Sequence, residues 1–146
     1  MQLTLTPAAN EVEFSDPALC GEWVSELPKM LDRPQRTPWC SYVARHEGRV
    51  VGLGGFKGPP AADDQVEIAN LTLLPREGRG VARAIAGQLL EVAREAGARG
   101  VIAHTLPENN ASTRVLEATG FTRIAEVEDP EDGTVWRWFR PLAPSA

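Results

Sequence analysis

The sequence has little of several features that mark particular classes of protein. Only two cysteines, Cys20 and Cys40, occur among 146 residues. That is too few for a disulfide framework, and neither lies at metal-ligand spacing from histidines or another cysteine. We therefore predict that both are reduced thiols and that the protein binds no metal.

Positive charge and long apolar runs are also scarce. The net charge is −5, which argues against affinity for nucleic acid or anionic membranes, because a basic field supplies most of that affinity. No segment approaches the about 20 apolar residues that a membrane span needs. The N-terminus lacks the basic start and apolar run of a signal peptide. We expect a cytoplasmic protein that binds neither nucleic acid nor membrane.

The composition that remains is that of one globular domain over residues 1–146. Hydrophobic residues make up 42% of the chain and charged residues 24%, which is typical of a soluble protein of this size. The length is sufficient for a single core and too short for two ordinary domains.

Apolar periodicity predicts an α+β order along the chain. Turn residues at Glu47-Gly48 and Asp132-Gly133 indicate two hairpins. Most neighbouring strands should be antiparallel, with one strand–loop–helix–strand crossover in the middle. Strands are expected at about 2–6, 41–46, 49–57, 65–74, 100–105, 121–128 and 134–140, and helices at about 15–31 (interrupted by Pro28), 81–96 and 110–118.

The strand predicted at 65–74 contains an irregularity. Val66 and Ile68 hold one phase of the polar–apolar alternation, and Leu71 and Leu73 hold the other. A β-bulge produces such a slip, and bulges bend strands near functional sites. We therefore predict a bulge within this strand.

The two later helices have recognisable ends. The predicted buried face of the first helix consists of Val81, Ile85, Leu89, Val92 and Ala96, and Gly97 is a natural C-terminal cap. Asn109 is expected to begin the second helix.

The turn before the first of these helices has the composition of a phosphate-binding site. Gly78 and Gly80 permit unusual backbone dihedrals and close approach of a ligand. No Ser, Thr, Asp or Asn stands where the N-cap should be, so the first amide groups lack an internal acceptor. Three arginines crowd this positive helix end, where a cation is disfavoured unless an anion binds. They are Arg76, Arg79 and Arg83.

Two common phosphate-binding motifs are excluded in this turn, while a simple solvated helix start stays an alternative. Val81 and Ala82 follow Gly80 where a P-loop requires Lys and Ser or Thr. A dinucleotide site requires a third small residue where Arg83 stands, and an acidic ribose ligand where the next strand ends in Thr105 and Leu106.

Two motifs together resemble the GNAT superfamily of N-acetyltransferases. EGRGVA, after a strand that ends in proline, is similar to the family pattern R/Q-x-x-G-x-G/A that opens a helix. ENNASTRVLEATGF resembles the pattern N-x-x-S/A-x-x-V/L-L/Y-E-x-x-G-F. Its Ser and VLE run are closest to the branch of ribosomal-protein-alanine acetyltransferases. The positions that fill the second pattern are Asn109, Ser112, Leu116, Glu117, Gly120 and Phe121.

This resemblance implies a fold and a coenzyme site. The fold would be a mixed, mostly antiparallel sheet of six to seven strands with a splayed, bulged strand and about four flanking helices. Acetyl-CoA would be the cosubstrate, its pantetheine arm pairing with the backbone of one strand, its pyrophosphate lying on the helix start, and Asn109 lying near the arm. The implied coenzyme-binding residues are Leu71, Thr72, Leu73, Gly78, Arg79, Gly80, Val81, Ala82, Arg83 and Asn109.

The resemblance also supplies catalytic candidates, with two open alternatives for the general base. Glu67 lies where many members place a carboxylate or a water, and His104 lies where some carry a glutamate. An unperturbed histidine pKa near 6.5 suits base catalysis at neutral pH. Leu116 replaces the tyrosine that many members use as general acid, so Ser112 is the candidate donor to the leaving sulfur.

We therefore expect an acetyl-CoA-dependent N-acetyltransferase, a monomer or homodimer, with an acceptor amine on a small molecule or peptide. Three departures separate it from its relatives: Glu77 in place of Arg or Gln, Leu116, and the absence of an N-terminal Arg-Leu-x-Leu-Arg pattern. One alternative is an acyl-CoA-binding protein of the same fold without catalysis, and another is a nucleotide-binding enzyme of a different fold.

Overall fold

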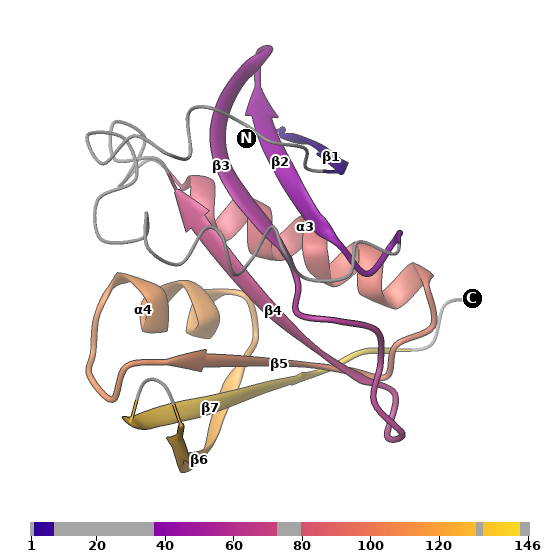
Figure 1. Cartoon of the computed structure of the whole chain (residues 1–146). Helices are drawn as coiled ribbons and strands as arrows, with labels where there is room; N and C mark the ends of the chain where they lie inside the picture. The colour runs from indigo at the N-terminus through magenta and orange to yellow at the C-terminus, as the bar shows by residue number, and fades with distance from the viewer. Residues whose placement is uncertain (1, 8–36, 73–79, 131–132, 144–146) are drawn as a thin grey trace.

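The computed structural model describes residues 2–7, 37–72, 80–130 and 133–143, with the side chains of residues 70–72 left out. The described strands form one seven-stranded sheet in the order β1-β2-β3-β4-β5-β7-β6 (Figure 1). Every neighbouring pair is antiparallel except β4 and β5. The strands are β1 (Thr4–Pro7), β2 (Ser41–His46), β3 (Arg49–Phe56), β4 (Gln65–Thr72), β5 (Gly100–Thr105), β6 (Thr122–Asp129) and β7 (Gly133–Pro141).

The predicted strands are therefore confirmed with small changes at their ends, and the α+β class is correct. The β2–β3 hairpin turns at Glu47 and Gly48, whose φ angles of 52° and 80° are both positive. Positive φ at both central residues gives the twist that joins antiparallel strands by a two-residue loop. The helical segment predicted before residue 31 lies outside the described residues.

Helix α3 (Val81–Glu95) connects the parallel strands β4 and β5 and packs against β3 and β4 (Figure 1). Its end is a Schellman motif: the Gly97 amide donates to the Arg94 carbonyl and the Ala98 amide donates to Ala93. Gly97 has a φ of 92°, as predicted. Ala96 is exposed, contrary to the prediction, and Ala93 is buried in its place.

Helix α4 (Ala111–Ala118) follows β5 and contacts α3. Asn110 caps it and not Asn109, because the Asn110 side chain accepts from the Thr113 amide while the Thr113 hydroxyl accepts from the Asn110 amide. This reciprocal capping box satisfies two groups that would otherwise be unpaired. Neither described helix is long and apolar enough to cross a membrane.

The end of the ENNASTRVLEATGF motif is explained by how helix α4 ends. Gly120 adopts a φ of 90°, and the Phe121 amide donates to the Leu116 carbonyl in another Schellman motif. Leu116 and Phe121 are both buried in the core. Leu-Glu-x-x-Gly-Phe therefore closes the helix and returns the chain to the sheet.

The core lies between the two helices and one face of the sheet. Trp138 is buried in it and donates from Nε1 to Thr105 Oγ1 at 3.0 Å, while Trp136 packs against the same cluster. Trp138 is therefore a core residue, and Trp136 is partly buried at the edge of the core. The α3 residues that face the sheet are Val81, Ile85, Ala86, Leu89, Leu90 and Ala93.

The predicted bulge in β4 is not found in its pairing with β3. Ile68 through Thr72 pair one by one with Phe56 through Gly52, without a register shift. The shifts in the sheet lie at Ala44/Arg45, against β3, and at Arg123/Ala125, against β7. The break in alternation along β4 is therefore not a bulge against β3.

We predict that Gly55→Ala destabilises the fold by about 1–3 kcal/mol, the usual range for overpacking. A Cβ at Gly55 would lie 2.5 Å from the Cys40 carbonyl oxygen and 2.6 Å from Ser41 Cα, and both are backbone atoms that cannot rotate away. The measurement is urea unfolding.

Gly87→Ala in α3 is the matched control. A Cβ there would meet no atom within 4 Å among the described residues, and alanine in a helix interior stabilises by about 0.5–1 kcal/mol relative to glycine. Equal unfolding midpoints for both variants would contradict the packing described at Gly55.

Candidate active site

Strands β4 and β5 pair over three residues and then separate. The pairs are Gln65–Gly100, Val66–Val101 and Glu67–Ile102. Beyond them β4 continues to Thr72 paired only with β3, and β5 continues to Thr105 paired only with β7. Figure 1 shows the two strands diverging toward their carboxyl ends. We call the separated segments, Ile68–Thr72 and Ala103–Thr105, the splay.

The splay leaves backbone groups without a strand partner. Inside a sheet each strand normally satisfies its amide and carbonyl groups on both sides, and an unsatisfied buried group costs about 1–3 kcal/mol. Along the splay no described strand pairs with the facing edges of β4 and β5. These edges are suited to an extended ligand that adds hydrogen bonds as a strand would.

Both described helices begin at the end toward which the splay opens, since α3 follows β4 and α4 follows β5 along the chain. The N-cap of α3 is Gly80, with a φ of 80° and no side-chain hydrogen bond to the helix start. A Cβ at Gly80 would meet no atom within 4 Å among the described residues. This exposed helix start, whose N-cap residue has no side chain to cap it, fits an anion.

The predicted coenzyme-binding residues lie at these places where the structure describes them. Leu71 and Thr72 are in the splay, and Gly80 to Arg83 form the start of α3. Val81 is buried, so it contributes its backbone and packs its side chain in the core. Leu73, Gly78 and Arg79 lie outside the described residues.

The residues predicted on the second motif lie at the start of α4. Asn109 immediately precedes the capping residue and is exposed, and Ser112 is exposed in the first turn. Because Asn110 provides the cap, the Asn109 side chain is not required for it. Leu116 faces the core at 7% exposure and cannot take the place of a general acid.

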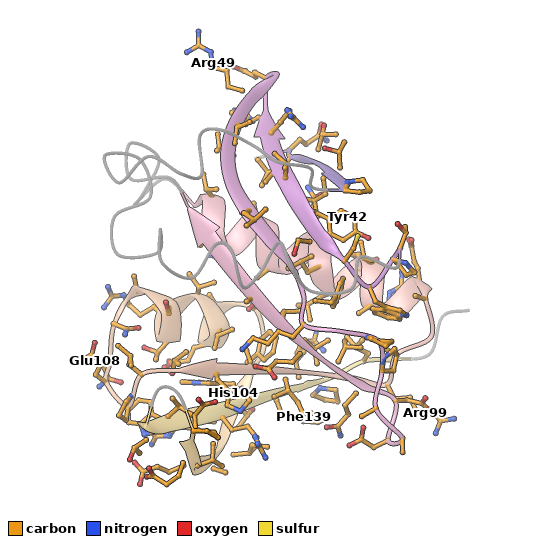
Figure 2. All side chains as sticks on the ribbon, viewed as in Figure 1. Tyr42, Arg49, Arg99, His104, Glu108 and Phe139 are labelled. Atoms are coloured by element: carbon orange, nitrogen blue, oxygen red, sulfur yellow. The ribbon has the colours of Figure 1, made fainter. Side chains whose placement is uncertain are left out.

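Glu67 and His104, proposed from the sequence as alternatives, are in direct contact. Glu67 is the last β4 residue paired with β5, opposite Ile102, and His104 lies two residues further along β5. Figure 2 labels His104 on that strand. Glu67 Oε2 is 2.8 Å from His104 Nδ1. The pair therefore spans the two strands where they separate.

Two more side chains extend this contact across the sheet. Lys57 Nζ lies 2.8 Å from Glu67 Oε2, and Arg137 Nε donates to His104 Nε2 at 3.1 Å. Lys57 follows β3, and its amide donates to the Glu67 carbonyl, while Arg137 on β7 pairs directly with His104. We call Lys57, Glu67, His104 and Arg137 the polar row.

The polar row lies on the face of the sheet opposite α3. Side chains alternate along a strand, and the neighbours of the row residues, among them Val66, Ala103 and Trp138, are buried in the core beneath the helices. The row itself is partly exposed, at 20% for the His104 side chain and 28% for that of Glu67. A ligand held at the helix starts and a molecule at the polar row would thus meet through the splay.

The bonds of His104 determine its tautomer. An arginine Nε can only donate, so His104 Nε2 must accept. The ring proton is then on Nδ1 and is donated to Glu67 Oε2. His104 is neutral in this arrangement, and neither of its nitrogens has a free lone pair.

Glu67 stays ionised. Partial burial acts to raise the pKa of its carboxyl, but hydrogen bonds from His104 and Lys57 and the lysine charge outweigh burial, so the pKa is below its usual value. Both donors bind Oε2. Among the described residues Oε1 has no hydrogen-bond donor, so it remains available to water or to a ligand.

Sequence reasoning missed Lys57 and Arg137. The strand prediction placed Arg137 between Trp136 and Trp138, and alternation alone puts it on the face opposite the core. That signal was sufficient to mark Arg137 as a charged residue on the free face. Its contact with His104 required the β5–β7 register, which the sequence does not supply.

Comparison with known proteins identifies the family of this chain. Residues 6–122 match the family described as an acetyltransferase (GNAT) domain. The chain belongs to this family of acetyltransferases. No curated protein matches the sequence.

Solved structures share the fold at low sequence identity. A spermidine N-acetyltransferase chimera from Vibrio cholerae and hSSAT superposes with a TM-score of 0.77 at 16% identity, covering 97% of this chain and 96% of that one. A ribosomal-protein-alanine N-acetyltransferase from Brucella melitensis gives 0.61 at 24% identity, covering 70% and 68%. The microcin self-immunity acetyltransferase MccE, solved with acetyl-CoA and AMP, gives 0.67 at 14%, covering 82% and 69%.

These neighbours establish the fold class and not the branch within the family. Their names refer to different acceptors, and all identities are under 25%. The resemblance to the ribosomal-protein branch is therefore weakly supported. The fold itself, with its seven-stranded mixed sheet, is that of the GNAT family.

We predict that Lys57→Met raises the pKa of Glu67, because one donor and one positive charge leave Oε2. The measurement is a pH titration of the Glu67 side-chain carboxyl by NMR, assigned with Glu67→Gln. Glu91, whose pKa is lowered by the neighbouring Arg94, is the internal control and should not change.

The lowered pKa of Glu67 also determines how the stability of the fold changes with pH. A carboxyl whose pKa is lowered on folding stabilises the fold above its unfolded pKa, here 4.5, and this contribution is lost as the pH falls through the folded value. Lys57→Met should reduce this loss. A Glu67 pKa that does not move in the variant would contradict the contact with Lys57.

Proposed function

We propose that the protein is an N-acetyltransferase that transfers the acetyl group of acetyl-CoA to a primary amine of a small molecule or peptide by direct attack on the thioester. One observation carries the proposal. An ionised Glu67, whose Oε1 has no hydrogen-bond donor among the described residues, lies where β4 and β5 separate. This is the closed end of a splay that opens toward a helix start with a glycine at its N-cap.

Each part of acetyl-CoA has a group of suitable chemistry on the chain. The pyrophosphate is assigned to the start of α3 at Gly80–Arg83, together with Gly78 and Arg79 from the sequence. The pantetheine arm is assigned to the edge of β4 at Leu71 and Thr72, together with Leu73 from the sequence, with Asn109 beside it. The support is the edge of β4 that no described strand pairs with and the absence of a capping side chain at Gly80.

The polar row is the acceptor side. The α3 start lies in the helix layer, whereas the row lies on the opposite face of the sheet. An amine on that face approaches the thioester through the splay, next to Glu67 Oε1. This arrangement brings the two substrates together from the two faces of the sheet and favours direct transfer without an acetylated residue of the protein.

We assign the role of proton acceptor to Glu67 and a positioning role to His104. Attack joins the amine nitrogen to the carbonyl carbon, and the nitrogen, cationic once bonded, gives a proton to Glu67 Oε1 directly or through water. His104 holds Oε2 through Nδ1–H, and its Nε2 lone pair is already engaged by Arg137. The carbon–sulfur bond then breaks.

The leaving thiolate needs little assistance. A thiol pKa near 8.5 makes thiolate a moderate leaving group. Ser112, exposed in the first turn of α4, is the proposed hydrogen-bond donor to sulfur. Leu116, where many relatives have tyrosine, is buried among apolar side chains and donates nothing.

The buried Leu116 also favours one other function, an acyl-CoA-binding protein without catalysis. Such a protein would use the splay and the helix start but not Glu67. The two functions differ in whether thiol is released from acetyl-CoA when an amine is added.

We predict that Glu67→Gln lowers kcat/KM by roughly 10²- to 10⁴-fold, the usual contribution of a general base, while the Kd for CoA changes little. The assay is thiol release from acetyl-CoA with a panel of amines. Glu91→Gln, which removes an exposed carboxylate paired with Arg94 on α3, is the matched control and should retain full activity.

The pH profile separates the two base candidates. With Glu67 as base, kcat/KM rises with pH toward the pKa of the amine itself, because Glu67 is ionised throughout. A histidine base adds an acidic limb, because the imidazole must first lose its proton. CoA binding without thiol release for any amine would instead support the binding protein, and failure to bind CoA would contradict both.

A further inference from the structure

Arg137 carries a positive charge that pairs with no acidic side chain among the described residues. Its Nε is used by His104, and its two η nitrogens make no hydrogen bond or ion pair among the described residues. The side chain is half-buried. A charge withdrawn from water is costly unless an opposite charge meets it.

Among the described residues, the neighbours of Arg137 on its face of the sheet include no carboxylate. On β5 its partner is His104, and on β6 its partner is Ala125. Along β7 the flanking residues on that face are Val135 and Phe139. The nearest acid in the polar row is Glu67, which lies beyond the neutral His104 ring and is already paired with Lys57.

The polar row therefore has one excess positive charge at its β7 end. Lys57 and Glu67 cancel, His104 is neutral, and Arg137 remains. The planar guanidinium presents donors in a fork that matches the two oxygens of a carboxylate or a phosphate. The unpaired η nitrogens point to an oxyanion as the missing partner.

We propose that Arg137 binds an oxyanion on the acceptor, so that the enzyme selects amines that carry a carboxylate or a phosphate group. This inference rests on the proposed function, in which the amine lies at Glu67. The two ends of the row then have different roles: Glu67 faces the nitrogen and Arg137 faces the anion. His104 separates them and sets the spacing of the two groups in the substrate.

The proposal discriminates between acceptor classes. A polyamine has only cationic groups and would be repelled by Arg137. The N-terminus of a long peptide has no oxyanion adjacent to its amine unless a neighbouring side chain provides one. An amino acid or an aminoalkyl phosphate satisfies both ends of the row.

The test uses the full chain saturated with CoA, so that the helix start is occupied. Acetate and inorganic phosphate are titrated separately, and the Nε–Hε resonance of Arg137 and the ring nitrogens of His104 are followed by NMR. We expect a saturable shift with acetate if the anion is a carboxylate and with phosphate if it is a phosphate group. Spermidine, the polycationic probe, should cause none.

The decisive variant is Arg137→Gln, which retains a possible donor to His104 but removes the charge and the fork. The affinity for the anion should fall roughly tenfold to a hundredfold, the range for loss of charge-assisted hydrogen bonds. Arg123→Gln is the matched control, because Arg123 lies on the adjacent strand and stacks on Trp136, 4.0 Å from its ring centroid, and it should bind the anion normally.

A second arm measures acetyl transfer to glycine against glycinamide and to O-phosphoethanolamine against ethanolamine. The anionic member of at least one pair should have the higher kcat/KM in the native chain, and Arg137→Gln should abolish that preference. Arg137→Lys, which keeps the charge without the fork, should restore part of it.

The outcomes separate this inference from the proposed function. If CoA binds but neither anion shifts the Arg137 resonance, the anion site is wrong and the acetyltransferase proposal stands. If an anion binds at Arg137 but CoA does not bind, the site stands and the proposed function falls. A preference for spermidine or for the neutral amines would overturn the selectivity.

Discussion

The separation of β4 from β5 after three paired residues is the constraint on which the rest of the site depends. Each strand keeps its other partner, so the sheet is continuous while two facing edges lose theirs. Unpaired backbone groups are unfavourable in a protein interior unless something binds them. The sheet thereby presents a binding edge without any special side chain.

The splay also determines where side chains meet. At its closed end a β4 residue and a β5 residue are still close enough for Glu67 and His104 to hydrogen-bond. Lys57 and Arg137 are placed by the outer pairings, one against β4 and the other against β5. The row is thus a consequence of strand register. It joins residues from four separate segments of the chain into one hydrogen-bonded set.

Charge is distributed along that row in a way that suits its proposed roles. Glu67 keeps its negative charge because its donors outweigh the effect of burial. His104 accepts from Arg137 through Nε2, which keeps the ring neutral, and its role is to hold Glu67 in place and not to accept a proton. The η nitrogens of Arg137 have no acidic partner among the described residues. A nucleophile and an anion can therefore be bound side by side, at opposite ends of one imidazole.

Much of the fold could be predicted from the sequence because local patterns determine it. The strands at 41–46 and 100–105 were predicted to the residue, and glycines at Gly97 and Gly120 end both described helices. Local patterns failed to predict the helix cap where two adjacent residues could both provide it. Asn109 and Asn110 are the same residue type and suit an N-cap equally well. Thr113, three residues after Asn110, forms the capping box that makes Asn110 the cap.

The site could be predicted only in part. A helix start without a cap is visible in the sequence, and Glu67 and His104 were named as separate candidates. Their contact joins residues 37 positions apart and requires the parallel register of β4 and β5. The slip in alternation at Leu71 was read as a bulge, although the strand in fact continues in register with β3 and loses β5. Leu73, Gly78 and Arg79 lie outside the described residues and remain predictions.

The most direct measurement of the central claim is amide hydrogen exchange along β4 with and without CoA. If the pantetheine arm pairs with the splayed edge, amides within Ile68–Thr72 that do not bond to β3 should exchange more slowly when CoA is bound. Amides of the β2–β3 hairpin should not change. Identical exchange along β4 in both states, under conditions where CoA is bound, would contradict the account.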